Sequence, residues 1–242
     1  MNVIVNNWLN SASAEKFFQQ EKKSFQRLSN QARGQMGIQL CMAEKNDYLA
    51  NINVSSQYQV SHDVGLFSHE TRQTENRVIA RLEELPFESN EFAIVIVPQM
   101  NLFSEDSHAA LREIYRVTAS DGLIAVSGIN PFSMMGVQAK FMPSKYPLLP
   151  TVSLGQMKVW LSLLGCEIVG GDLFHYSAMS HVSSYPRVAR SIESIGNRWL
   201  PMASGGYWLL AKKRLFGQQI KRFGQLKAIK TGKIAGQVAS KY

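Results

Sequence analysis

The pattern of apolar and polar positions is clearest between residues 80 and 130. The apolar run Phe92–Val97 is typical of a strand that is buried on both faces. Residues 106–117 show the period of an amphipathic helix, and the largely apolar residues 123–128 follow a turn at Asp121-Gly122. A strand, a helix and a second strand in this order form a βαβ unit, which predicts a parallel sheet with its ligand site at the carboxyl ends of the strands.

Shorter signals of the same kind flank this stretch. Residues 12–32 have apolar positions at helical spacing, and Ser13 is the predicted N-cap of this helix. Further strands are expected at 38–42, 58–64, 78–81, 166–174 and 206–212, and a helix capped by Ser153 is expected to end at Leu164. Residues 130–150 are predicted to be rich in loops, and 175–204 to form an insertion with one helix at 185–199.

At 242 residues the chain has the length of one large α/β domain with appendages. We assign residues 1–214 to this domain and residues 215–242 to a basic C-terminal tail. Residues 212–242 hold nine Lys and Arg residues and no acidic residue, in a chain of net charge +8. The tail is therefore either a solvated extension or a segment that contacts nucleic acid or an acidic membrane surface.

The composition disfavours several classes of protein. Two cysteines, Cys41 and Cys166, are too few for a disulfide framework and have no metal-ligand spacing, so no metal site is expected. No apolar run approaches the ~20 residues that cross a bilayer, and residues 1–13 lack the pattern of a signal peptide. These observations predict a cytoplasmic protein without a transmembrane segment.

Distinct motifs stand on either side of the strand Phe92–Val97. Leu85-Pro86-Phe87 precedes it, and the helical sequence LREIYRV at 111–117 follows it. Together with residues 160–165 and 205–213, these motifs resemble the class I S-adenosylmethionine (SAM)-dependent methyltransferases, and within them the type 11 methyltransferase domain family. The resemblance implies an α/β, doubly wound, three-layer Rossmann-like fold. Its seven-stranded sheet would be mostly parallel, with an antiparallel last strand.

The resemblance also implies a SAM site after the first strand, where the family has Gly-x-Gly-x-Gly followed by a helix. In this chain Cys41, Ala43 and Lys45 stand at the three glycine positions. Cys41 and Ala43 are small enough to contact the cofactor, although neither reaches positive φ as cheaply as glycine does. Lys45 is bulky and charged, so the glycine-rich motif is degenerate.

Other candidate ligand contacts lie after the second, third and fourth strands. Asp63 matches the family's acid that binds the ribose hydroxyl groups, whereas Arg81 replaces an acid that binds the adenine amino group. Leu82 can still offer its backbone N–H to the adenine ring. Gln99 and His108 are the polar groups best placed for the cofactor and the methyl acceptor, and a histidine near a helix N-terminus is held neutral and can act as a base.

Three functions remain open from the sequence. The first is a SAM-dependent methyltransferase that acts on an unidentified acceptor. The second is a protein of the same fold that has lost SAM binding and serves as a binding or scaffold module. The third is a nucleic-acid-binding protein whose basic tail makes the contact. Fold alone does not choose among them, because different sites are grafted onto one fold.

Overall fold

The structure is a computed structural model that describes residues 8–28, 33–41, 46–61, 76–141, 149–175 and 204–214. Its centre is a seven-stranded sheet in the order β3-β2-β1-β4-β5-β7-β6. The strands are β1 (Arg33–Leu40), β2 (Asn53–Ser61), β3 (Asn76–Ile79), β4 (Phe92–Val97), β5 (Thr118–Ile129), β6 (Cys166–Phe174) and β7 (Gly206–Lys213). All the strands run parallel except β7, which pairs antiparallel with both β5 and β6. The predicted fold class is confirmed.

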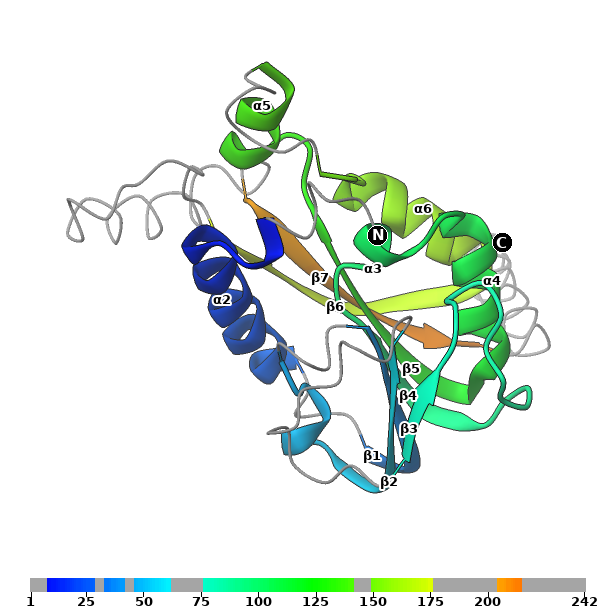
Figure 1. Ribbon diagram of the computed structural model, residues 1–242. Helices are drawn as coiled ribbons and strands as arrows, with labels where there is room; N and C mark the ends of the chain where they lie inside the picture. Colours follow the sequence, from blue (N-terminus) through cyan, green and yellow to red (C-terminus); the bar gives the residue numbers. More distant parts are fainter. Residues whose placement is uncertain are drawn as a thin grey trace, which may run out of the picture.

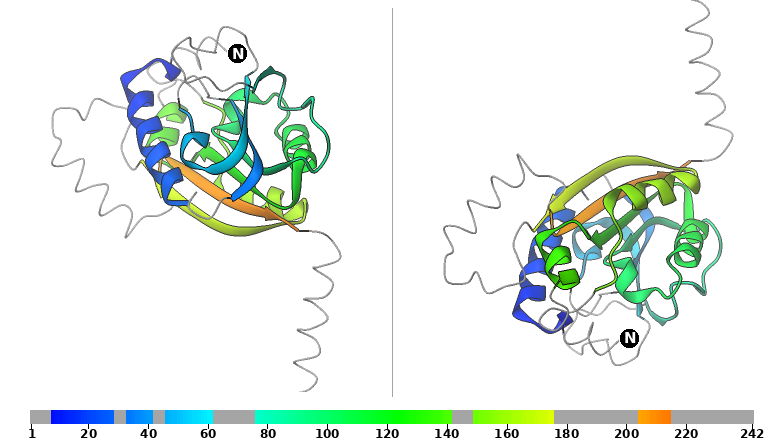
Figure 2. Two further views of the ribbon diagram at one scale, coloured as in Figure 1. Left: turned by 90° about the horizontal axis from the view of Figure 1, so that it is seen from below. Right: turned by 90° about the horizontal axis from the view of Figure 1, so that it is seen from above.

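Helices cover both faces of the sheet and complete three layers (Figure 1). Helix α2 (Ala12–Leu28) lies on one face, whereas α3 (Met100–Phe103), α4 (Ser107–Val117) and α6 (Leu154–Leu163) lie on the other. The two further views in Figure 2 also show α2 beside β6 and β7. None of these helices, nor any other in the described ranges, is long and apolar enough to span a bilayer.

Two short helices differ from what the sequence predicted. One lies where loops were expected, and the other lies where the family resemblance implies a longer helix. Helix α5 (Met134–Phe141) follows the end of β5, within the stretch predicted to be rich in loops. The 3-10 turn η2 (Leu49–Asn51) is the helical element between β1 and β2 in the described part of that connection. The family resemblance implies a helix after the glycine-rich loop, and β2 begins too early, at Asn53, to leave room for a long one. The predicted helix at 185–199 lies outside the described residues.

Side-chain caps fix where the helices begin. The Asp106 side chain accepts hydrogen bonds from the backbone N–H of His108 and Ala109 (2.8 and 3.1 Å), and the Ser153 hydroxyl accepts one from Gln156 N–H (3.2 Å). The Ser153 cap was predicted, whereas Asp106 was expected as the first residue of its helix and not as its cap. The predicted cap of α2 was wrong: Ser11 accepts from Ala14 N–H at 3.2 Å, two residues before the predicted Ser13, which already lies in the helix.

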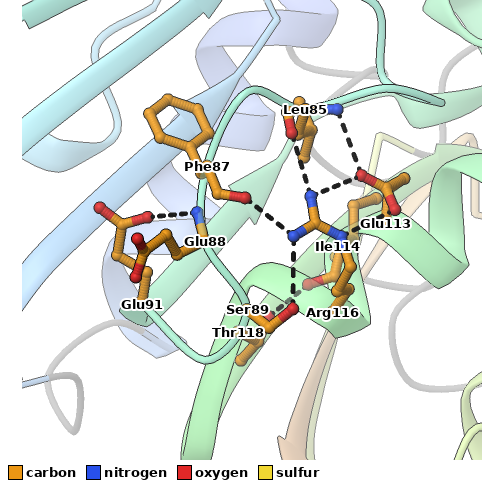
Figure 3. Close-up of polar contacts among 9 residues, drawn as sticks. All are labelled: Leu85, Phe87, Glu88, Ser89, Glu91, Glu113, Ile114, Arg116 and Thr118. Atoms are coloured by element: carbon orange, nitrogen blue, oxygen red, sulfur yellow. Dashed lines mark hydrogen bonds and ion pairs between the residues drawn. The ribbon is translucent and has the colours of Figure 1, made fainter.

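An arginine joins helix α4 to the turn before β4 (Figure 3). The Arg116 guanidinium donates to the carbonyl oxygens of Phe87 (2.8 Å) and Leu85 (3.0 Å) and to both oxygens of Glu113 (2.9 and 2.8 Å). Glu113 in turn accepts from the backbone N–H of Leu85 at 3.2 Å. The two motifs that carry the family resemblance are therefore one hydrogen-bonded unit, made possible by the planar five-donor fork of arginine.

We expect Arg116→Met to lower the free energy of unfolding by about 1–2 kcal/mol. The methionine keeps the apolar stem but leaves two carbonyl groups and a carboxylate without their donor, in a setting where the arginine is one-third exposed. The measurement is urea unfolding at neutral pH. Arg112→Met on the exposed side of the same helix is the matched control, and equal losses in the two variants would contradict this role of Arg116.

Candidate active site

The carboxyl ends of the parallel strands meet at one edge of the sheet. Strand β1 has β2 on one side and β4 on the other, although β4 comes much later in the chain. The strand order therefore reverses between β1 and β4, and the connections that follow these two strands run to opposite sides. At such a topological switch point a crevice forms outside the carboxyl ends of the strands, and ligands bind in it. This edge contains the segments after β1, β2 and β4 in which the sequence predicted site residues.

Cys41 adopts the backbone conformation that glycine usually supplies. Its φ is 66°, in the left-handed region, and its N–H donates to Val60 O at 2.8 Å. The adjacent Gln39 braces this turn: its amide Nε2 donates to Cys41 O (3.2 Å) and Asn46 O (2.7 Å), and its Oε1 accepts from Tyr48 N–H (2.8 Å). The loop after β1 is thus held from both ends by one buried side chain, which compensates for the strain of a non-glycine residue there.

The structure describes only some of the other residues that were predicted to contact the cofactor. Ala43 and Asp63 lie outside the described residues, and the described part of β2 ends at Ser61. Leu82 is buried. Arg81 turns its guanidinium to Glu105 at 2.6 Å and to Glu83 at 3.9 Å, so it offers no acceptor to an adenine.

The two predicted catalytic candidates lie in different surroundings. Gln99 is 1% exposed and has a left-handed backbone (φ 49°), and its N–H donates to the hydroxyl of Ser127 at 2.8 Å. His108 stands in the first turn of α4, where its ring packs on that of Trp160 in α6 with centroids 4.4 Å apart. The structure therefore brings Gln99 into a buried cluster with α2 and pairs His108 with α6.

A buried glutamate on α2 is the centre of that cluster. Glu21 is fully buried, and its Oε1 accepts from Gln99 Nε2 (2.7 Å) and from the Ser127 hydroxyl. Its Oε2 accepts from Tyr48 Oη at 2.7 Å. Burial raises the pKa of Glu21 to about 7, against the opposing effect of these three donors. Burial and the nearby Glu21 together raise the pKa of Tyr48 well above its usual value.

Sequence reasoning missed Glu21, and a signal for it existed. Glu21 stands four residues after Phe17 and four before Phe25, so it lies on the apolar stripe of the amphipathic helix. A carboxylate in such a stripe is rarely buried unless it has partners. Its partners could not be predicted because they come from the loop after β1, from the turn after β4 and from β5, far apart in the sequence.

A cavity of about 330 Å³ opens beside this cluster at the amino end of α2. The residues that line it include Glu15, Phe18 and Asn46. Asn46 Nδ2 also donates to Phe18 O (3.4 Å) and to Tyr48 Oη (3.3 Å). The cavity is therefore linked by one amide to the buried hydrogen-bond cluster, and it combines an acid, amides and apolar surface as small-molecule sites do.

The first three basic residues of the stretch 212–242 precede the predicted tail and have partners within the domain. Lys212 and Arg214 both pair with Asp121, at 3.2 and 2.7 Å, and Arg214 also pairs with Glu167 at 2.8 Å. Lys213 is 5% exposed and donates to three oxygen acceptors, Asn90 Oδ1, Tyr115 O and Thr118 O, at 2.9, 2.7 and 2.7 Å. These three cations stabilise the fold, and residues 215–242 lie outside the described part.

Parts of the sequence match known proteins. A family model described as a methyltransferase domain, that of type 11, matches residues 50–126. The uncharacterized protein YafS of Escherichia coli (strain K12) is 34% identical over 95 residues, which cover 38% of this chain and 39% of YafS. The match thus spans about two fifths of the length of that relative.

Solved structures share the whole architecture. A SAM-dependent methyltransferase of Thermotoga maritima, described as a possible histamine N-methyltransferase, aligns with a TM-score of 0.63 and 16% identity over 87% of this chain and 97% of that one. A S-adenosylmethionine-dependent methyltransferase of Mesorhizobium loti aligns with a TM-score of 0.56 and 10% identity over 78% and 95% of the two chains. At these identities the likeness establishes the fold.

Family and fold together imply S-adenosylmethionine as the cofactor. Two observations show that the described residues fit such a ligand. The left-handed turn at Cys41 lets the backbone come close to a ligand at the end of β1. Gln59, in register with Gln39 on the neighbouring strand, is 1% exposed, and its Nε2 has no hydrogen-bond partner among the described residues. This donor is available to a polar ligand near the same strand ends.

Proposed function

We propose that the chain is a SAM-dependent methyltransferase of the type 11 family and that it methylates a small polar acceptor. The observation that carries this proposal is the turn at Cys41, which keeps a glycine-like backbone at the cofactor edge without a glycine. A chain that had abandoned the ligand would have no need of this strained conformation, or of the buried glutamine that braces it.

Each predicted contact residue has a proposed part in holding the cofactor. The Cys41 turn and Ala43 border its amino-acid end, Asp63 accepts from its ribose hydroxyl groups, and Leu82 offers a backbone N–H to its adenine. Gln99 closes the crevice at the end of β4. When bound, the cofactor supplies an electrophilic methyl group on a sulfonium.

The acceptor is proposed to enter through the cavity at the amino end of α2. Its volume of about 330 Å³ suits a small molecule. From this cavity the acceptor would present a lone pair toward the bound cofactor and would release its proton to water through the open side. The chain contributes mainly by holding the reactants in line, which accelerates such reactions strongly.

We expect the purified chain to bind S-adenosylhomocysteine with a micromolar dissociation constant in isothermal titration. Asp63→Asn should weaken this binding about tenfold, since a bidentate charged acceptor of the ribose is lost. Glu88→Gln is the matched control, because Glu88 is an exposed carboxylate at the opposite end of β4. Absence of binding at millimolar ligand would overturn the proposal in favour of a binding module with a methyltransferase fold.

A further inference from the structure

We infer that Glu21 is a positioning residue for the cofactor crevice. By its carboxylate it holds the loop after β1 and the turn after β4 in the arrangement that binds the ligand. This inference rests on the proposed function. It assigns to the N-terminal helix a part in ligand affinity that goes beyond covering the sheet.

One arm of the Glu21 cluster reaches the loop after β1. Tyr48 Oη donates to Glu21 Oε2, and the backbone N–H of Tyr48 donates to Gln39 Oε1. Gln39 Nε2 then donates to the carbonyl of Cys41. The carboxylate on α2 is therefore connected through two buried side chains to the turn that replaces the first glycine.

The other arm reaches the turn after β4. Gln99 is held in the left-handed region by two bonds, from its N–H to Ser127 Oγ and from its Nε2 to Glu21 Oε1. Ser127 also donates to Glu21. Thus the turns on both sides of the crevice contain a left-handed residue other than glycine, and both are stabilised by groups that converge on one carboxylate.

The packing of α2 on the sheet does not require a glutamate at position 21. The adjacent aromatic residues of α2 already bury its apolar stripe: Phe25 packs on Trp208 with centroids 4.9 Å apart, and Phe17 on Phe174 at 5.1 Å. An aliphatic residue at position 21 would avoid the cost of burying a carboxyl group. The groups that donate to Glu21 include Tyr48 from the loop after β1 and Gln99 from the turn after β4, which border the crevice. A carboxylate at position 21 therefore fits a role in positioning these two segments.

The ionised carboxylate is the form that matches this geometry. Three donors point at its two oxygens, and a proton on either oxygen would face one of them. Affinity for the ligand should therefore rise as Glu21 ionises, around pH 7.

Other titratable groups also pack against this part of α2. Burial lowers the pKa of His175, which bonds to Gln20, to about 4. Asp172 accepts from Ser24 and pairs with Arg27. Among the described contacts of Glu21, Tyr48 is the other titratable group, and its pKa is raised.

The test compares S-adenosylhomocysteine affinity, by isothermal titration from pH 6 to 8.5, in wild type, Glu21→Gln, Tyr48→Phe and Phe25→Leu. The glutamine keeps the size of the side chain, but its NH₂ group replaces one carboxylate oxygen that accepts from Tyr48 or from Gln99 and Ser127. We expect binding about tenfold weaker in Glu21→Gln and less weakened in Tyr48→Phe. In the wild type affinity should rise about tenfold across pH 7, and in Glu21→Gln it should stay flat.

Phe25→Leu is the control for stability, since it loosens the packing of α2 on Trp208 and Tyr48 but removes no hydrogen bond of the cluster. If Phe25→Leu weakens binding as much as Glu21→Gln at a similar loss of stability, or if both pH profiles coincide, the positioning role is overturned. If wild type binds no ligand, the proposed function fails. Hydrogen exchange of residues 46–52 and 98–103 then decides the positioning role separately: faster exchange in Glu21→Gln supports it, and unchanged exchange overturns it.

Discussion

Trp208→Ala is expected to lower the free energy of unfolding by about 3–5 kcal/mol, the range of large-to-small substitutions of buried aromatic residues. Trp208 is fully buried in the middle of β7, between β5 and β6. Its ring packs on Phe25 and Tyr48, with centroids 4.9 and 5.5 Å apart, and its Nε1 donates to Glu21 O at 3.1 Å. The substitution therefore leaves a cavity between α2 and the sheet and removes the hydrogen bond from Trp208 to the Glu21 carbonyl.

Trp208→Phe separates packing from the hydrogen bond. It keeps most of the ring and loses the Nε1 donor, so its cost should be smaller, about 1–2 kcal/mol. Urea unfolding at constant pH measures both variants, and the slope of the transition should stay unchanged if the native state keeps its compactness. A loss in Trp208→Ala below that in Trp208→Phe would contradict the packing of α2 on β7 described above.

The elements with long and regular patterns could be predicted from the sequence. Strands β4 and β6 match their expected bounds, because their apolar runs end at clear turn residues. Helix α4 begins at Ser107, one residue after the expected first residue Asp106, whose side-chain bonds cap the helix and fix its start. Strands β1 and β2 begin earlier than expected, at Arg33 and Asn53, since their first halves are polar or contain glycine and carry no apolar signal.

The site was harder to predict than the fold because its contacts join distant segments. The degenerate glycine motif was visible in the sequence, yet the conformation that Cys41 adopts depends on Gln39, which the sequence marked only as part of a strand. Similarly, Gln99 was a candidate for its place after β4, whereas its partner Glu21 lies 78 positions earlier. Pattern reasoning locates the ends of elements, but it cannot pair side chains across a sheet.

The buried Glu21 also predicts how stability depends on pH. In the unfolded chain its pKa is near 4.5, and in the folded protein burial raises it to about 7. Between these values the folded state retains a proton that the unfolded state has lost, so the contribution of Glu21 to stability is present below pH 4.5 and is lost as pH rises to 7. The loss amounts to about 3 kcal/mol at 1.36 kcal/mol per unit of pKa.

Glu21→Gln isolates this contribution, because the wild-type profile also contains an opposing one. His175 has its pKa lowered from 6.5 to about 4 by burial, so its effect on stability is a gain as pH rises between those values. We expect the free energy of unfolding of wild type minus that of Glu21→Gln to fall by about 3 kcal/mol between pH 4.5 and 7 in urea titrations. A difference that is constant with pH would mean that Glu21 has the same pKa in the folded and unfolded chain, with its three donors offsetting its burial. A difference that rises with pH would mean that they lower its pKa below that of the unfolded chain.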